Sequence, residues 1–130
     1  MKLLYIDDSI EILELVSQYL SDYANFTILV TNDEHEALSL IAERVIDLVV
    51  TEVDLRPVSG IELYRTTRTI APDMPFIFVT TYPPAPRLRE LLEQEQALRV
   101  VYKDGYAGSF LPTLRRTVLE VGRRRSYRPQ

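Results

Sequence analysis

The 130-residue sequence contains no cysteine and only one histidine, His35. Disulfide bonds, thiolate metal sites and cysteine nucleophiles are therefore excluded, and so is any site that needs two histidines. Glycine is also scarce, with four residues in the whole chain. No Gly-x-Gly-x-x-Gly motif follows the first apolar segment and no P-loop motif occurs, which excludes the common glycine-rich loops that bind nucleotide phosphates.

Long hydrophobic runs are missing as well. No apolar stretch approaches the roughly 20 residues that a membrane-spanning helix requires, and the N-terminus turns acidic after one short apolar stretch, unlike a secretory signal. Hydrophobic residues make up 46% of the chain and charged residues 26%, which is the balance of a folded globular protein. Length and composition together predict one cytoplasmic domain with a single core and no membrane partner.

Basic residues are sparse in most of the chain and concentrated at its C-terminal end. Residues 115–130 hold six arginines and one acidic residue, a net charge of +5, whereas the other residues carry a net charge of -9. An acidic body repels nucleic acid. The charge distribution therefore argues against a nucleic-acid partner unless the basic end did all the binding.

Five short apolar segments, rich in β-branched and aromatic residues, recur at residues 3–6, 26–30, 48–50, 76–79 and 100–102. Several of them are continuously apolar, which is typical of strands that are buried on both faces. Stretches with helical spacing lie between them, including a fourth helix at about residues 87–96 and a fifth at about residues 109–122. This alternation predicts an α/β domain, a (βα)5 unit with a doubly wound parallel sheet and helices on both faces.

The first three helices have recognisable starts and inward-facing residues. Ser9, Asp33 and Ser59 are of the residue types that cap helix N-termini. In the first two helices, the apolar residues at helical spacing predict the buried face. These residues are Ile12, Leu15, Val16, Tyr19 and Leu20 in the first, and Ala37, Leu38, Ile41 and Ala42 in the second.

Polar residues gather where the predicted strands end, which is the edge where doubly wound sheets place their chemistry. Asp7 and Asp8 follow the first strand, Glu52 and Asp54 follow the third, Thr80 ends the fourth, and Lys103 ends the fifth. Carboxylates are the ligands that a hard divalent cation prefers, while a lysine and a hydroxyl can hold an anion. The pattern predicts a weak Mg²⁺ site at the four carboxylates, with Thr80 and Lys103 as anion-binding or switch residues.

These motifs resemble the receiver domains of bacterial response regulators, over residues 2 to about 122. The matching motifs are Leu4-Tyr5-Ile6-Asp7-Asp8-Ser9, Glu36-Ala37-Leu38, Asp47 to Glu52 with Gly60 eight residues later, Pro75 to Thr80, and Ala97 to Lys103. The resemblance implies a flavodoxin-like fold with strand order 2-1-3-4-5 and a receiver-like domain at residues 1–122. Residues 123–130 then form a basic tail or linker.

The most important departure from the family is Glu52, which stands where receivers carry the phosphoacceptor aspartate. Glutamate keeps the charge but extends the carboxylate by one methylene, and phosphoryl transfer depends on accurate in-line placement. The departure predicts that phosphorylation is absent or impaired. In one interpretation Glu52 pairs with Lys103 and Thr80 and imitates the phosphorylated form; in the other it only fills the pocket of a constitutive scaffold.

Other departures point in the same direction. Thr81 is larger than the usual residue after the conserved hydroxyl, and the following loop, Tyr82-Pro83-Pro84-Ala85-Pro86, is stiffened by proline. Val100 takes the position that is aromatic in many receivers. We expect Tyr102, one residue before Lys103, to point to the opposite face.

The resemblance implies a non-enzymatic signalling module of two-component signal transduction that binds a histidine kinase, an effector domain or a second copy of itself. The implied contact surface comprises the helix at 87–96, the strand at 100–102 and the helix at 109–122. Opposed charges on these elements could support a homodimer. The charged residues concerned are Arg87, Arg89, Glu90, Glu93, Glu95, Arg115 and Arg116.

Two alternatives use the same residues differently. Asp7, Asp8, Glu52 and Asp54 loosely resemble the acidic cluster of Toprim-type enzymes, so an Mg²⁺-dependent phosphoryl-transfer or nuclease-type enzyme is the second hypothesis. Arginines at the C-terminal end could bind nucleic acid, although no recognised binding motif accompanies them.

Overall fold

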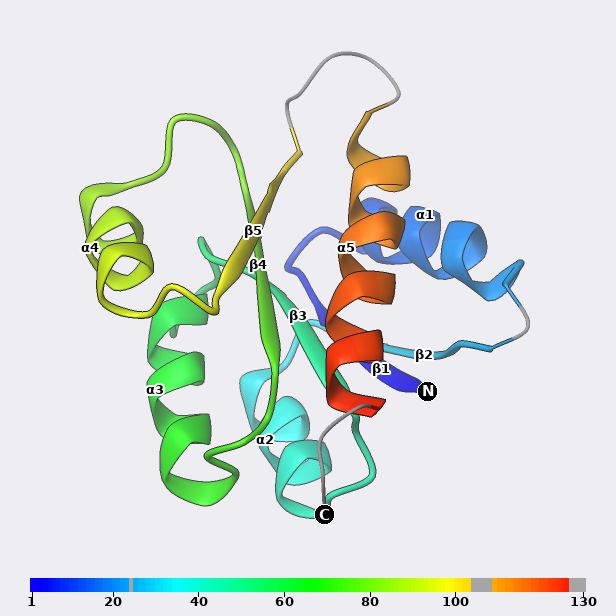
Figure 1. Cartoon of the computed structure of the whole chain (residues 1–130), viewed down its shortest axis with the longest axis horizontal. Coiled ribbons are helices and arrows are strands. Elements are labelled where there is room, and N and C mark those ends of the chain that lie inside the picture. Colours follow the sequence, from blue (N-terminus) through cyan, green and yellow to red (C-terminus); the bar gives the residue numbers. More distant parts are fainter. Residues whose placement is uncertain (24, 104–108, 127–130) are drawn as a thin grey trace.

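The computed structural model describes residues 1–23, 25–103 and 109–126. Strands and helices alternate along the whole chain (Figure 1). In order, the elements are β1 (Lys2–Ile6), α1 (Ile10–Ser21), β2 (Thr27–Thr31), α2 (Glu34–Ala42), β3 (Leu48–Glu52), α3 (Gly60–Ile70), β4 (Phe76–Thr80), α4 (Pro86–Gln94), β5 (Arg99–Tyr102) and α5 (Phe110–Ser126).

The strands form one parallel sheet in the order β2-β1-β3-β4-β5, as predicted. Every residue of β3 and β4 is buried, because both strands lie inside the sheet and have helices over both faces. This double burial explains why their sequences are almost continuously apolar instead of alternating.

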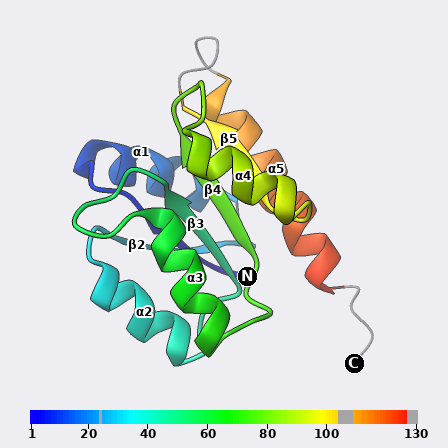
Figure 2. The ribbon, with the colours of Figure 1, turned by 90° about the vertical axis from the view of Figure 1, so that its left-hand side faces the viewer.

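Two hydrophobic layers enclose the sheet. Helices α1 and α5 cover one face, and α2, α3 and α4 cover the other, so helices lie on both faces as predicted (Figures 1 and 2). Leu13, Val16 and Leu114 belong to the first layer, and Ile41 and Leu88 belong to the second. Because strand side chains alternate between faces, each strand contributes to both layers.

The predicted caps of the first three helices are present. The side chains of Ser9, Asp33 and Ser59 accept hydrogen bonds from backbone N–H groups in the first turns of α1, α2 and α3. Helix α4 has no side-chain cap, but it begins with Pro86, whose missing N–H costs little in a first turn.

Three details of the predicted helices were wrong. Leu15 is 45% exposed, while Leu13, not assigned to the inner face, is buried against the sheet. Ala42 is exposed at the end of α2. Helix α5 continues to Ser126, so the first residues of the predicted tail are helical. Val16 and Leu20 are buried as predicted, so only part of the inner face of α1 was assigned wrongly.

The described helices lack the combination of length and hydrophobicity that a membrane crossing requires.

The consequence of the parallel arrangement for function is geometric: all five strands run in the same direction, so their carboxyl ends meet along one edge of the sheet.

Candidate functional site

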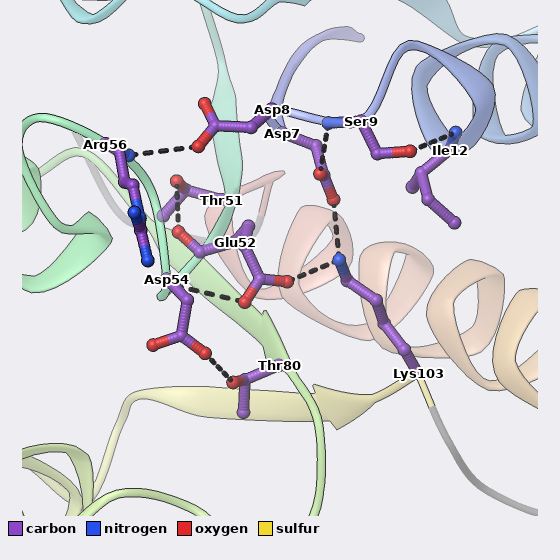
Figure 3. A network of polar contacts seen from close by, with 10 residues as sticks. All are labelled: Asp7, Asp8, Ser9, Ile12, Thr51, Glu52, Asp54, Arg56, Thr80 and Lys103. Atoms are coloured by element: carbon purple, nitrogen blue, oxygen red, sulfur yellow. Dashed lines mark hydrogen bonds and ion pairs between the residues drawn. The ribbon is translucent and has the colours of Figure 1, made fainter.

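The carboxyl-terminal edge of the sheet brings together Asp7, which follows β1, Glu52, which ends β3, and Lys103, which follows β5 (Figure 3). Asp7 and Glu52 are almost fully buried, with side chains 3% and 7% exposed. They come from adjacent strands, because Ile6 pairs with Thr51 in the register of β1 and β3. Asp7 is two residues after the buried Tyr5, and Glu52 is two residues after the buried Val50. Both side chains therefore point to the face of the sheet that α1 and α5 cover.

Lys103 bridges these two carboxylates. Its Nζ lies 2.8 Å from Asp7 Oδ2 and 2.6 Å from Glu52 Oε2. The Lys103 side chain is only 19% exposed, so the contacts are poorly screened by solvent. The sequence-based expectation that Lys103 and Glu52 meet agrees with this geometry, and the second contact, to Asp7, was not predicted.

Backbone N–H groups hold the other oxygen of each carboxylate. The Ser9 N–H donates to Asp7 Oδ1 at 2.9 Å, and the Asp54 N–H donates to Glu52 Oε1 at 3.1 Å. All four carboxylate oxygens of Asp7 and Glu52 therefore have a positively polarised partner. Such a network fixes the position of both side chains.

Burial and charge shift the pKa values in this network. Burial raises the pKa of Glu52 above its ordinary 4.5, and the contacts with Lys103 and the Asp54 N–H only partly offset this effect. Burial lowers the pKa of Lys103, but the two carboxylates outweigh it and the net result lies above 10.5. Burial therefore disfavours the charged form of Glu52, and the neighbouring Lys103 ammonium favours it.

Tyr5 lies beneath the ion pairs and was not identified as a site residue. It is fully buried, and its hydroxyl has no hydrogen-bond partner among the described residues. Burial, followed by the charges of Asp7 and Glu52, raises the pKa of this phenol. The signal that could have found Tyr5 is its position two residues before Asp7, on the same face of β1.

Thr80 does not make the contact expected of it. Its hydroxyl donates to Asp54 Oδ2 at 3.5 Å, the long limit of a hydrogen bond, and not to Glu52. The reason lies in the register of β3 and β4, where Glu52 pairs with Val79. Thr80 is the next residue, so its side chain leaves on the opposite face of the sheet, the face that carries Phe78 and α4.

The four predicted metal ligands are not gathered around one point. The Lys103 ammonium lies between Asp7 and Glu52, the exposed Asp8 accepts the Arg56 N–H at 3.0 Å, and Asp54 contacts Thr80. In the part of the chain that the structure describes, no three His, Asp or Glu side chains are grouped as a metal site. Carboxylates suit Mg²⁺ chemically, but this arrangement does not fit a resident cation and gives no support to the metal-dependent enzyme hypothesis.

Gly60 supports the end of β3 from the first turn of α3. Its N–H donates to the Val53 carbonyl at 2.8 Å, and a Cβ at this position would lie 2.3 Å from the Glu52 carbonyl oxygen. Only glycine permits this close approach. The glycine eight residues after Glu52, one of the motif residues, is thus required by backbone packing at the site.

The aromatic residues near β5 differ from the expectation. Tyr102 was expected on the face opposite to Val100, but residues two apart share a face of a strand, so this prediction was wrong. The Tyr102 ring packs edge-on against Tyr82, with centroids 5.2 Å apart. Tyr82 is 66% exposed, and the pair forms an aromatic surface at the start of the segment that leads to α4.

Comparisons with known proteins agree with the fold and the motifs. The sequence profile described as the response regulator receiver domain matches residues 3–111. No curated protein matches the chain. Among solved structures, the chemotaxis protein CheY4 of Vibrio cholerae is 26% identical, with a TM-score of 0.71, over 88% of this chain and 96% of that chain.

Two further structures, each under 25% identical, show likeness of fold alone. A signal receiver domain of an HD domain-containing protein from Pseudomonas fluorescens Pf-5 is 24% identical with a TM-score of 0.76, over 98% of this chain and 93% of that chain. A CheY-like receiver domain protein from Methanospirillum hungatei JF-1 is 21% identical with a TM-score of 0.74, over 92% and 94%.

Proposed function

Because the chain belongs to the response regulator receiver domain family, we propose that it is a non-catalytic signalling module that works through protein–protein contacts, with phosphorylation absent or impaired. In this proposal Glu52 occupies the phosphoacceptor position, at the end of β3 and eight residues before Gly60. The observation that carries the proposal is the short ion pair between Glu52 and Lys103.

The chemistry of phosphoryl transfer supports this proposal. The nucleophilic oxygen must approach the phosphorus in line with the leaving group, and an error of about 1 Å costs on the order of 100-fold in rate. The extra methylene of Glu52 displaces its carboxylate by a comparable length. Both oxygens are also engaged, one by Lys103 and one by the Asp54 N–H, so neither is free to attack.

The contacts of Glu52 match only half of those expected for an imitation of the phosphorylated form. The Lys103 contact is present, whereas the Thr80 hydroxyl is held by Asp54. We therefore propose that the Lys103 side of the switch is fixed and that the Thr80 side is independent of Glu52. Partner binding should then not require a phosphodonor.

The proposed contact surface comprises α4, β5 and α5. Arg99 of β5 pairs with Glu120 of α5, which ties these two elements together. Leu88 and Leu91 anchor α4 to the core, so the charged residues of α4 face outward. A partner of this surface would be a histidine kinase, an effector domain or a second copy of the chain.

Phosphodonor labelling tests the proposal. Incubation with a small phosphodonor and Mg²⁺, followed by intact-mass measurement, should give no stable mass increase for the wild type. Glu52→Asp should label slowly, because Thr81 still narrows the approach. Asp54→Asn in that background serves as the matched control and should still label. Rapid labelling of the wild type, mapped to Glu52 or Asp54, would overturn the proposal.

A further inference from the structure

A cavity lies beside the site, on the side of Glu52 away from Lys103. It has a volume of about 290 Å³ and is formed by the segment after β3, the first turn of α3 and the start of α4. Val53, Leu55 and Ile61 form its apolar wall, and each of them is at most 8% exposed. Figure 3 shows Asp54 and Arg56, two of its lining residues, on that side of Glu52.

Two arginines give this cavity a positive rim. Arg56 and Arg87 line it from opposite segments, and both are exposed. The Arg56 guanidinium has no ion-pair partner among the described residues, and the Arg87 pair with Glu62 is long, at 3.9 Å, and more than half exposed on both sides. Long, exposed pairs are weak, so both cations are available to a ligand.

The start of α4 adds to this positive potential. Helices α1, α2 and α3 each have an acidic residue in the first turn, but α4 has none. Its N-cap residue, Ala85, lines the cavity and makes no side-chain cap. The positive end of the α4 dipole is thus uncompensated beside the arginines. The one carboxylate in the lining, Asp54, already accepts the Thr80 hydroxyl.

We propose that this cavity binds a short segment of a partner protein in which an apolar side chain stands next to a carboxylate. The apolar side chain would lie against the small exposed parts of Val53, Leu55 and Ile61, and the carboxylate would pair with Arg56 and Arg87. A volume of about 290 Å³ is at the lower limit for small-molecule sites, about 300–1,000 Å³, and suits one or two side chains. A long polyanion is disfavoured because residues 1–114 carry a net charge of -9.

This binding site overlaps the α4–β5–α5 surface only at the start of α4, and it does not depend on whether Glu52 can be phosphorylated. It is nevertheless connected to the switch residues. Asp54 lines the cavity, donates its N–H to Glu52 and accepts the Thr80 hydroxyl. A ligand that displaces the Asp54 carboxylate therefore changes the hydrogen bond of Thr80.

Blocked dipeptides test the proposal by NMR titration of the full chain. Acetyl-Leu-Asp-amide should shift the backbone amides of residues 53–61 and 85–88. Arg56→Gln and Arg87→Gln should each weaken its binding by about three- to fivefold, whereas the matched control Arg89→Gln, on α4 but outside the cavity lining, should not. Acetyl-Leu-Asn-amide and acetyl-Gly-Asp-amide should bind more weakly, because each lacks one of the two recognised groups.

The same titration defines what would overturn the proposal. Shifts that lie elsewhere, or no shift at any soluble peptide concentration, would refute the site. Equal binding of the Leu-Asp and Leu-Asn peptides would refute the role of the arginines. If inorganic phosphate and the Gly-Asp peptide both bind as well as the Leu-Asp peptide, the cavity is a simple anion site and not a protein-docking site.

Discussion

Replacing Lys103 by methionine should strongly destabilise the protein at neutral pH. Methionine is similar in length and removes only the ammonium, so Asp7 and Glu52 remain buried without their counterion. Removing one partner of a buried ion pair typically costs about 3–5 kcal/mol. At about 4 °C per kcal/mol for a domain of this size, we expect Tm to fall by about 12–20 °C.

Thermal and urea unfolding, followed by circular dichroism, would measure this loss. The matched control is Lys2→Met, because Lys2 is the only other lysine and is exposed; it should change stability by less than about 0.5 kcal/mol. The deficit of Lys103→Met should shrink as the pH falls, because the buried Glu52 carboxylate, left without its counterion and with a raised pKa, takes up a proton.

A double variant separates lost charge pairing from lost packing. In the Lys103→Met background, Glu52→Gln removes one of the two unpaired charges while keeping the shape of the side chain, so it should restore part of the lost stability. The argument is refuted if the Lys103→Met variant is no less stable than Lys2→Met. It is also refuted if the double variant is as unstable as Lys103→Met alone.

Three further predictions concern the same edge of the sheet. The raised pKa of Glu52 means that the folded state binds more protons than the unfolded state above pH 4.5. The free energy of unfolding of wild type, relative to that of Glu52→Gln, should therefore fall as the pH rises from 4.5 through the folded pKa. A difference in unfolding free energy that does not change with pH would contradict this. Gly60→Ala should cost about 2 kcal/mol in urea unfolding, because its Cβ would meet backbone, whereas Gly122→Ala meets only the flexible Met1 side chain and should cost little. Mg²⁺ should raise the Tm of wild type less than that of Glu52→Asp, because the wild type should bind Mg²⁺ with an affinity in the millimolar range at most. Tight Mg²⁺ binding by wild type would show that Lys103 does not hinder the cation.

The sequence was sufficient to predict that Asp7, Glu52 and Lys103 lie at one edge of the sheet, but not all of the contacts that each side chain makes there. Parallel strands share their carboxyl edge, so Asp7, Glu52 and Lys103 had to lie close together once the strands were recognised. Gly60 followed from motif spacing and is explained by a close backbone approach to Glu52. These features depend on strand direction and register, which the apolar pattern largely determines.

The partners of Thr80, Asp8 and Asp54 could not be predicted in this way. Each depends on the path of the segment after β3, where the Arg56 N–H reaches Asp8 and the Asp54 carboxylate reaches Thr80. Such contacts depend on loop backbone angles and side-chain rotamers, and the periodic pattern of apolar residues gives no information about either. The cavity next to Asp54 was missed for the same reason, since three separate segments form it.

The geometry also limits where regulation of this domain can act. A ligand shifts a conformational equilibrium only by its differential affinity for the two states. Under our proposal the Glu52–Lys103 ion pair is present whether or not a phosphodonor is, so it cannot distinguish one state from another. The hydrogen bond that the Thr80 hydroxyl donates to the exposed Asp54 carboxylate is long, at 3.5 Å, so it can be exchanged at low cost. A ligand in the adjoining cavity would lie next to Asp54, which is one of the lining residues. Under this proposal, a ligand that binds in the cavity would change the Thr80–Asp54 hydrogen bond and then the position of α4, without any chemical change at Glu52.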